Sequence, residues 1–309
     1  MGKSKGGIEG FERVWASQPI RRRGLQAWPP SIVLIVVLPH LLFADWLILV
    51  APLNPKVLIA MPAYNEAGRI ENFIQELSQE IKGVELSFIV VDDASSDSTY
   101  ESLVVLSTQD INIAVEQNLV NQGHGPSTIK ALTLAVNQKP DCILMIDGDG
   151  HFDCTEVSNI LTFFLENSYD IVEGVRIHRN DPFFRKIVSA ITRWLVARES
   201  GVQPGDANTP LRLYKTETAK LLLTHIPRNS LIPNLHISSL TRTLPLKFRE
   251  FQVKPYIRPS TVAIANPTMQ QIGTSWGPSI NVLPNSKFIK FCVKSTFEWL
   301  EISRTGKIE

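Results

Sequence analysis

Short apolar runs alternate with amphipathic stretches through the middle of the chain. The apolar runs begin at Lys56 (KVLIAM), Leu86 (LSFIVV), Ile113 (IAVE), Cys142 (CILMI) and Asp170 (DIVEG). Residues 70–81, 98–106, 127–136 and 156–165 lie between them and place apolar side chains at helical spacing. Apolar strands that alternate with amphipathic helices are typical of a mainly parallel sheet covered on both faces. The pattern therefore predicts an α/β fold.

Polar side chains follow three of these runs, at the point where each predicted strand ends. They are Pro62-Ala-Tyr-Asn-Glu66, Asp92-Asp-Ala-Ser-Ser-Asp97 and Asp147-Gly-Asp-Gly-His151. In parallel sheets, ligands bind beyond the carboxyl ends of the strands. Taken singly, Asn65 and Ser95 could cap helices, and Asp-Gly pairs are ordinary turn residues. Taken together, acidic groups at one sheet edge repel one another, which indicates a cation or a donor-rich ligand.

The segment after the fourth run contains the sharpest of these candidates. Asp147, Asp149 and His151 alternate with glycine, so in an extended chain they project to one side and leave room for a close ligand. Two carboxylates and an imidazole suit a hard divalent cation with octahedral geometry. We therefore expect Mg²⁺ or Mn²⁺ here, where the ion would neutralise a diphosphate leaving group.

Three motifs together resemble those of a known family. They are Met61-Pro-Ala-Tyr-Asn-Glu66, Val91-Asp-Asp-Ala-Ser-Ser-Asp97 and Met145-Ile-Asp-Gly-Asp-Gly-His151. Their order and spacing resemble the nucleotide-binding motifs of family 2 glycosyltransferases with the GT-A fold. The resemblance covers roughly residues 56–258 and implies a nucleotide-sugar-binding fold with a mainly parallel central sheet.

Within that family, the second half of the chain resembles the dolichyl-phosphate mannose synthase type. The matching segments are Gly174-Val-Arg176, Pro182-Phe-Phe-Arg-Lys-Ile-Val-Ser189, Asp206 and Leu211-Arg-Leu-Tyr214. Enzymes of this type pass a sugar from a nucleotide diphosphate sugar to a polyprenyl phosphate. The resemblance therefore implies a metal-dependent, inverting glycosyltransferase with a UDP- or GDP-sugar donor and a polyprenyl-phosphate or other lipid-linked acceptor.

The resemblance also assigns roles to individual residues. For the donor, it implies that Pro62, Tyr64 and Glu66 line the nucleoside pocket, that Asp93 accepts a hydrogen bond from the base, and that Asp147 contributes to nucleotide-sugar binding. It implies metal ligation by Asp147, Asp149 and His151. Arg176 and Arg185, with Ser189 nearby, match positions that bind the acceptor phosphate, for which the forked guanidinium is well suited.

Two departures from that type leave the acceptor open. Gln usually stands where this chain has His151, and the usual Ser-Gly-Phe segment is replaced by Asn208-Thr-Pro-Leu211. The alternative acceptor is a saccharide hydroxyl, as in the synthesis of cell-surface polysaccharides. A hydroxyl needs a general base, for which Asp206 is the candidate, although its counterpart in the family could instead be structural. A phosphate acceptor is already anionic, so arginine positioning would then do most of the catalytic work.

Composition excludes one class of partner. The 309 residues include 31 Lys+Arg and 30 Asp+Glu, for a formal net charge of +1. No dense stripe of Lys and Arg compensates for this near-neutral balance, so we expect no nucleic-acid partner.

Both ends of the chain carry signals for a membrane surface. Residues 32–50 are apolar except for Pro39, His40 and Asp45, and they follow Arg21-Arg-Arg23. The run is about as long as the roughly 20 residues that span a bilayer, and the preceding arginines favour a cytoplasmic N-terminus. Asp45 and Pro39 argue against insertion, which leaves three hypotheses: a membrane-embedded or interfacial helix, a helix packed on the soluble domain, or an extension with little role.

Near the C-terminus, residues 287–299 interleave lysine with phenylalanine and tryptophan. At helical spacing, Phe288, Phe291, Cys292 and Trp299 can share one side. Such a helix could lie in a lipid headgroup layer or close the core of the domain. We therefore expect a membrane-associated protein at the cytoplasmic face, with three parts: a basic N-terminus and hydrophobic helix (1–52), the GT-A domain (53–260) and a tail with an amphipathic helix (261–309).

Other function classes find less support. Gly123-His-Gly125 lacks the third glycine of a dinucleotide fingerprint, and the chain has no P-loop motif. Arg193-Trp194 is interpreted as part of an amphipathic helix, and His124 as a solvated or core histidine. A nucleotidyltransferase would need a glycine-rich basic loop at the N-terminal side, and a non-catalytic nucleotide-sugar binder would not need the Asp147, Asp149 and His151 set.

Overall fold

The computed structural model describes residues 54–177, 183–254 and 286–305. The chain divides into Met1–Leu49 and Val50–Glu309, and every described residue belongs to the second unit. The hydrophobic helix predicted at 32–50 lies outside the described residues, and so do residues 261–285 and 306–309 of the predicted tail. Within the described ranges, no helix combines the length and the apolar character needed to cross a bilayer.

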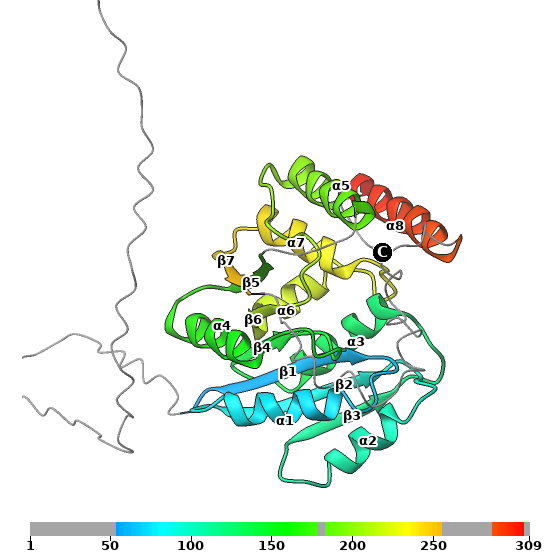
Figure 1. The fold of residues 1–309 in the computed structure, drawn as a ribbon. Coiled ribbons are helices and arrows are strands. Elements are labelled where there is room, and N and C mark those ends of the chain that lie inside the picture. Colours follow the sequence, from blue (N-terminus) through cyan, green and yellow to red (C-terminus); the bar gives the residue numbers. More distant parts are fainter. Residues whose placement is uncertain (1–53, 178–182, 255–285, 306–309) are drawn as a thin grey trace, which may run out of the picture. The chain divides into compact units, whose positions relative to one another are not determined.

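The described residues form a seven-stranded, mostly parallel sheet (Figure 1). The strands lie in the order β3-β2-β1-β4-β6-β5-β7. Their bounds are β1 Lys56–Ala63, β2 Glu85–Asp92, β3 Ile113–Gln117, β4 Cys142–Met145, β5 Ile171–Arg176, β6 Arg212–Lys215 and β7 Phe248–Val253. Strands β1 to β4 pair in parallel, and so do β5 and β7, whereas β6 runs antiparallel to β4 and β5. The five predicted strands are confirmed, together with the mainly parallel sheet.

The helices connect these strands as the βα rhythm predicts. The helices α1 Ile70–Glu80, α2 Thr99–Leu106, α3 His124–Asn137 and α4 Cys154–Glu166 follow the first four strands. They confirm the four predicted helices with ends shifted by a few residues. The second half adds α5 Phe183–Ser200, α6 Thr216–Leu223, α7 Pro233–Thr243 and α8 Ser286–Thr305.

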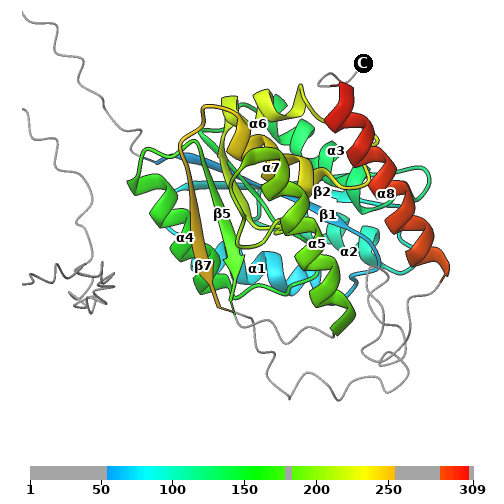
Figure 2. The ribbon, with the colours of Figure 1, turned by 90° about the horizontal axis from the view of Figure 1, so that it is seen from above.

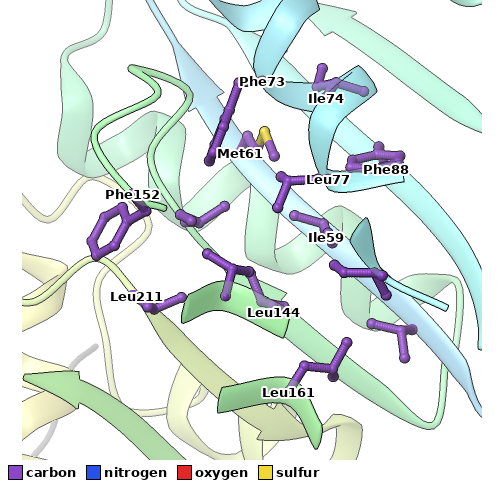
Figure 3. Packing of buried hydrophobic residues seen from close by; sticks show 14 of the residues in the cluster. Ile59, Met61, Phe73, Ile74, Leu77, Phe88, Leu144, Phe152, Leu161 and Leu211 are labelled. Atoms are coloured by element: carbon purple, nitrogen blue, oxygen red, sulfur yellow. The ribbon is translucent and has the colours of Figure 1, made fainter. Parts of the chain in front are cut away.

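Two buried layers cover the two faces of the sheet. Because side chains alternate along a strand, Ile59 and Met61 of β1 pack against α1, α2 and α4 on one face (Figure 3). Leu58 and Ala60 pack against α3, α6 and α7 on the other face. Leu77 of α1 is completely buried in the first layer. Replacing such a leucine by alanine costs about 2 to 5 kcal/mol, so this packing fixes the sheet that carries the site.

A third, smaller buried cluster joins α5, α7 and α8. It contains Val196 of α5, Leu235 of α7 and Trp299 of α8. Figures 1 and 2 show α5 and α8 along the outer side of the layer that contains α7. The helix predicted near the C-terminus is present, and Trp299 helps to close the core. Phe291, which was expected to share a side with Trp299, is instead 44% exposed.

Candidate functional site

The carboxyl ends of β1, β2 and β4 bring the predicted polar segments to one edge of the sheet. Parallel pairing places Ala63 of β1 opposite Asp92 of β2, and Ala60 opposite Met145 of β4. The backbone N–H of Gly148 donates to Pro62 O at 3.2 Å. A β-carbon on Gly148 would lie 2.8 Å from Ile70 Cδ1. The loop therefore packs closely on β1 and α1, and a larger residue at position 148 would require the end of the Ile70 side chain to shift.

The loops after β1 and β2 are tied together by side chains. Asn65 adopts a left-handed backbone conformation with φ of 56°, and its Oδ1 accepts a hydrogen bond from Ser96 N at 2.8 Å. Ser95 Oγ accepts one from Asn65 N at 2.9 Å. Neither residue is a helix cap, because α1 begins after Arg69 and α2 after Ser98. These two residues shape the loop pair instead.

The three β1-side residues predicted to line the nucleoside pocket lie in or beside this loop pair. Pro62 is buried, and Tyr64 is half-buried. Glu66 is buried, its N–H donates to Thr99 Oγ1 at 2.8 Å, and its Oε2 lies 3.2 Å from Arg69 Nη1. The structure thus brings the three residues together at one sheet edge.

Asp93, predicted to bind the base, is almost fully buried at the end of β2. Its Oδ1 accepts from Asn118 Nδ2 at 2.8 Å and from Gln122 N at 2.9 Å. Its Oδ2 accepts from Gly123 N at 2.8 Å. The carboxylate therefore holds the loop that enters α3, a structural task that the sequence pattern did not reveal. A role in base recognition stays a prediction.

Asp147 and Asp149 follow β4, and the charge of Asp149 lies close enough to influence the ionisation of Asp147. Burial raises the pKa of Asp147, His124 opposes that rise, and the charge of Asp149 adds to it. Arg176 and His151 also work to lower the pKa of Asp147, which remains raised overall. A carboxylate pair with this mutual repulsion suits a bound cation. The side chains of Asp147, Asp149 and His151 are therefore chemically suited to bind Mg²⁺ or Mn²⁺.

His151 lies at the exposed rim of this loop. Its backbone N–H donates to Asp149 Oδ1 at 3.0 Å, and its Nε2 lies 3.7 Å from Asp149 Oδ2. No group of three or more His, Cys, Asp or Glu side chains is arranged to hold a metal ion within the described ranges. Metal ligation by Asp147, Asp149 and His151 therefore stays a prediction that rests on the chemistry of these residues.

The structure adds His124, which the sequence analysis interpreted as a solvated or core histidine. It is the first residue of α3, and its Nε2 lies 3.5 Å from Asp147 Oδ1. A β-carbon on the next residue, Gly125, would lie 2.2 Å from Ser230 O, so this helix end packs tightly against the chain before α7. The feature of the sequence that could have pointed to His124 is its place in a Gly-His-Gly segment just before a predicted helix.

Arg176 and Asp206 form an ion pair next to these acidic residues. Arg176 ends β5, and its Nε and Nη2 lie 2.9 Å and 2.8 Å from Asp206 Oδ2. Asp206 Oδ1 accepts from Asn208 N at 3.2 Å, and the residue is 6% exposed. The structure thus joins two residues that the sequence predicted separately as catalytic.

The remaining predicted acceptor residues belong to α5. Arg185 lies near the start of this helix, and its side chain lies outside the described part of the structure. Ser189 follows one turn later and is half-buried. Arg193, one turn further on, donates from Nε to Pro204 O at 2.9 Å, which ties α5 to the segment that carries Asp206. Arg193 thus serves in an amphipathic helix, as predicted.

Comparison with protein families shows which family this chain belongs to. The model described as glycosyl transferase family 2 matches residues 58–227, from β1 to the segment after α6. The chain belongs to glycosyl transferase family 2. The predicted family and the predicted class of enzyme, a glycosyltransferase, are confirmed.

Curated relatives of this family 2 chain carry names of the polyprenyl-phosphate type. The undecaprenyl-phosphate 4-deoxy-4-formamido-L-arabinose transferase of Yersinia enterocolitica is 31% identical over 193 residues, which cover 61% of this chain and 57% of the relative. The enzyme of the same name from Serratia proteamaculans is 27% identical over 208 residues, 65% of this chain and 63% of the relative. The chain thus spans less than two thirds of the length of these relatives.

Solved structures show a similar fold at low sequence identity. Glucosyl-3-phosphoglycerate synthase from Mycobacterium tuberculosis, in complex with UDP, superposes with a TM-score of 0.54 at 18% identity, over 82% of each chain. A second structure of that synthase gives a TM-score of 0.53 at 16% identity, over the same shares. The mixed α/β architecture of this chain is therefore shared with that synthase.

Proposed function

We propose that this chain transfers a sugar from a UDP- or GDP-sugar to a polyprenyl phosphate, with inversion at the anomeric carbon. The observation that carries the proposal is the Arg176–Asp206 ion pair beside Asp147. It holds the positively charged guanidinium of Arg176, which suits an acceptor phosphate, next to the acidic residues proposed to bind the sugar donor. Family membership supports the nucleotide-sugar donor. The names of the curated relatives support the polyprenyl-phosphate acceptor.

In the proposed site, the sugar donor and the acceptor phosphate bind at the ends of different strands. Pro62, Tyr64, Glu66 and Asp93 would bind the nucleoside at the ends of β1 and β2. Asp147, Asp149 and His151 would hold Mg²⁺ or Mn²⁺, which when bound supplies positive charge to the donor diphosphate. Arg176, Arg185 and Ser189 would bind the acceptor phosphate at the end of β5 and on α5.

The proposed transfer exchanges one bond for another. An oxygen of the acceptor phosphate forms a bond to the anomeric carbon while the bond from that carbon to the donor diphosphate breaks, and the nucleoside diphosphate leaves. A phosphate oxygen is already anionic, so no proton has to be removed. The task of the protein is to hold the two reacting groups in line, which is where Arg176 contributes.

The environment of Asp206 favours this acceptor over a saccharide hydroxyl. Its Oδ2 accepts a hydrogen bond from Arg176 Nε and lies 2.8 Å from Arg176 Nη2, and its Oδ1 accepts one from the backbone N–H of Asn208. A buried carboxylate held in this way orients the guanidinium of Arg176. We therefore assign Asp206 a structural role in positioning Arg176 and keep general-base catalysis on a sugar hydroxyl as the alternative function.

A membrane surface is part of the proposal, because a polyprenyl phosphate resides in a lipid bilayer. The outer faces of α5 and α8 carry exposed apolar side chains, among them Trp194 (56% exposed) and Phe297 (68% exposed). Exposed lysines accompany them, Lys186 on α5 and Lys290 and Lys294 on α8. Aromatic and basic side chains on a helix surface suit an anionic headgroup layer. We propose docking of these helices at the cytoplasmic face.

The test combines the membrane-bound full chain with polyprenyl phosphate, Mn²⁺ or Mg²⁺ and a panel of radiolabelled UDP- and GDP-sugars. Metal-dependent label in the organic extract, lost in Asp149→Asn, is the expected result and names the donor. Metal-dependent release of nucleoside diphosphate together with transfer of the labelled sugar to a saccharide acceptor, without organic label, would favour the alternative function. If neither signal is found with any donor, the proposed activity is wrong.

A further inference from the structure

The segment that carries Asp206 is fixed from several elements outside the site. On one side, Glu250 of β7 accepts from Gly205 N through Oε1 at 2.7 Å. A β-carbon on Gly205 would lie 2.9 Å from Val175 Cγ1 and 3.0 Å from Glu250 Oε2. The backbone just before Asp206 therefore lies close against Val175 of β5 and the carboxylate of Glu250.

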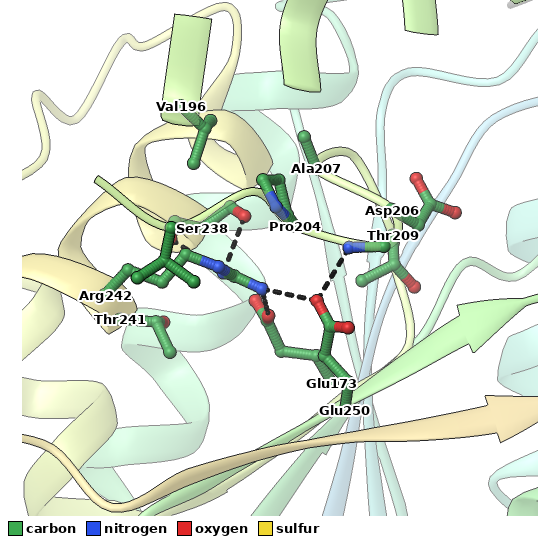
Figure 4. Close-up of polar contacts among 12 residues, drawn as sticks. Glu173, Val196, Pro204, Asp206, Ala207, Thr209, Ser238, Thr241, Arg242 and Glu250 are labelled. Carbon is green, nitrogen blue, oxygen red and sulfur yellow. Dashed lines mark hydrogen bonds and ion pairs between the residues drawn. The ribbon is translucent and has the colours of Figure 1, made fainter. Parts of the chain in front are cut away.

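Glu250 is itself held by a buried ion network. Arg242 of α7 places Nη2 at 2.7 Å from Glu250 Oε1 and at 2.7 Å from Glu173 Oε2 (Figure 4). The side chains of Arg242 and Glu173 are essentially inaccessible to solvent. A carboxylate paired with a buried, hydrogen-bonded arginine is confined to one orientation. Glu250 thus presents Oε1 to Gly205 from a fixed position.

The other end of the segment is held by the same network. Glu173 also pairs with Arg212, whose Nε lies 2.9 Å from Glu173 Oε1. Arg212 Nη1 donates to Thr209 O at 2.6 Å, and Arg212 Nη2 to Ala207 O at 3.4 Å. The buried arginines therefore fix the backbone on both sides of Asp206.

Glu250 differs from the other members of this network in its exposure. Its side chain is 34% exposed, whereas those of Glu173, Arg212 and Arg242 are at most 1% exposed. Loss of a fully buried partner would leave an unpaired charge in the core and threaten the fold. When Glu250 is changed, Glu173 remains within reach of both Arg242 and Arg212, so the one unbalanced positive charge falls on Arg242, at the more exposed end of the network.

We propose that Glu250 is a positioning residue for sugar transfer, which acts through the Gly205 amide to set Asp206 and, through it, the guanidinium of Arg176. The inference rests on the proposed function and extends it to β7 and α7. Both contacts of Glu250 to this network use Oε1, so a glutamine can accept from the same two donors, whereas alanine cannot. Both variants remove the charge of Glu250, but only alanine removes the acceptor oxygen. A defect found with alanine and not with glutamine would therefore come from the lost hydrogen bonds.

The test compares Glu250→Ala and Glu250→Gln, with Gln252→Ala as the matched control at an exposed position of the same strand. In the transfer assay we expect Glu250→Ala to lower kcat by about tenfold to a hundredfold with an unchanged KM for the nucleotide sugar, because misplacement of a catalytic group slows the reaction by such factors. Glu250→Gln should restore most of kcat. Gln252→Ala should match the wild type.

Hydrogen exchange provides a readout that does not depend on activity. Amides in residues 205–209 should exchange about tenfold faster in Glu250→Ala and at the wild-type rate in Glu250→Gln, because local opening follows the loss of a hydrogen bond. An unchanged kcat in a folded Glu250→Ala, or a glutamine variant as impaired as alanine, would overturn the inference. If the wild type transfers no sugar, the proposed function fails. Unchanged exchange in Glu250→Ala would then independently refute the positioning of this segment.

Discussion

Arg176 directs two of its donors, Nε and Nη2, to a single oxygen of Asp206, at 2.9 Å and 2.8 Å. The two residues come from different elements, since Arg176 ends β5 and Asp206 precedes β6. Two donors directed at one carboxylate oxygen restrict the orientation of the guanidinium. The pair therefore links the end of β5, near Asp147, with the segment before β6, in which Gly205 N donates to Glu250.

The first prediction concerns Arg176→Lys. Lysine keeps the positive charge but replaces the planar fork by one ammonium group, so it cannot reproduce both contacts to Asp206. The loss of one charged hydrogen bond is worth about 1.5 to 3 kcal/mol, which corresponds to roughly a tenfold to hundredfold lower rate if the geometry is needed in the transition state. Steady-state kinetics measure the effect. Arg249→Lys, at an exposed position of β7, should leave the rate unchanged, and an unimpaired Arg176→Lys would contradict the assigned role.

The second prediction concerns Asp149→Asn. Asparagine can still accept the hydrogen bond from His151 N, so the variant should fold with the thermal stability of the wild type. Removing one carboxylate from the proposed metal site should lower metal-dependent transfer by about a hundredfold or more, because metal charge stabilisation is worth several kcal/mol.

A matched control for Asp149→Asn lies four residues further along the chain. Asp153 caps α4 by accepting from Thr155 N and Glu156 N, and asparagine is an equally good cap. Asp153→Asn should therefore retain both activity and stability. Full activity in Asp149→Asn, measured over a titration of Mn²⁺, would remove this residue from the metal site.

The third prediction concerns the apolar surfaces of α5 and α8. Trp194→Glu and Phe297→Glu each place an acidic group on a face proposed to enter the headgroup layer, where burial of a charge is unfavourable. Both variants should sediment less with vesicles that contain anionic phospholipid. Val105→Glu is the control, because Val105 is 61% exposed on α2. Equal sedimentation of all three variants with the wild type would argue against docking through these helices.

The fourth prediction concerns the attachment of α8 and its dependence on pH. Burial of Glu298 works to raise its pKa, but hydrogen bonds from His236, Ser230 and Leu231 N outweigh that effect and hold the pKa below its ordinary value of 4.5. A carboxyl whose pKa is lower in the folded state stabilises the fold above its unfolded pKa. This contribution is lost as the pH falls below 4.5 through the lowered folded-state pKa.

Thermal unfolding of Glu298→Gln tests that linkage. The variant should have a lower Tm than the wild type at pH 7, and the difference should shrink as the pH is reduced below 4.5. Glu217→Gln, at a position 85% exposed on α6, should change Tm little at either pH. A difference that persists unchanged at acid pH would show that the ionised carboxylate is not what anchors α8.

The first half of the fold could be predicted from the sequence because its strands and helices have regular local patterns of apolar residues. The buried strands β1, β2 and β4 are continuous apolar runs, and α1 repeats Ile70, Phe73, Ile74 and Leu77 on one face. β6 is harder to predict, since it has only four residues and contains the fully buried Arg212. Its charge is tolerated because Glu173 and Asn234, distant in sequence, supply its partners.

The site was predictable in its residue types but not in its pairings. The sequence by itself determined the family, the α/β rhythm and the acidic groups at the strand ends, because these depend on residue type and on order along the chain. Only the tertiary structure decided that Arg176 pairs with Asp206, that Asp93 holds the loop before α3, and that His124 lies beside Asp147. Such contacts depend on sheet register and helix packing, which bring distant residues within hydrogen-bonding distance and leave no trace in local periodicity.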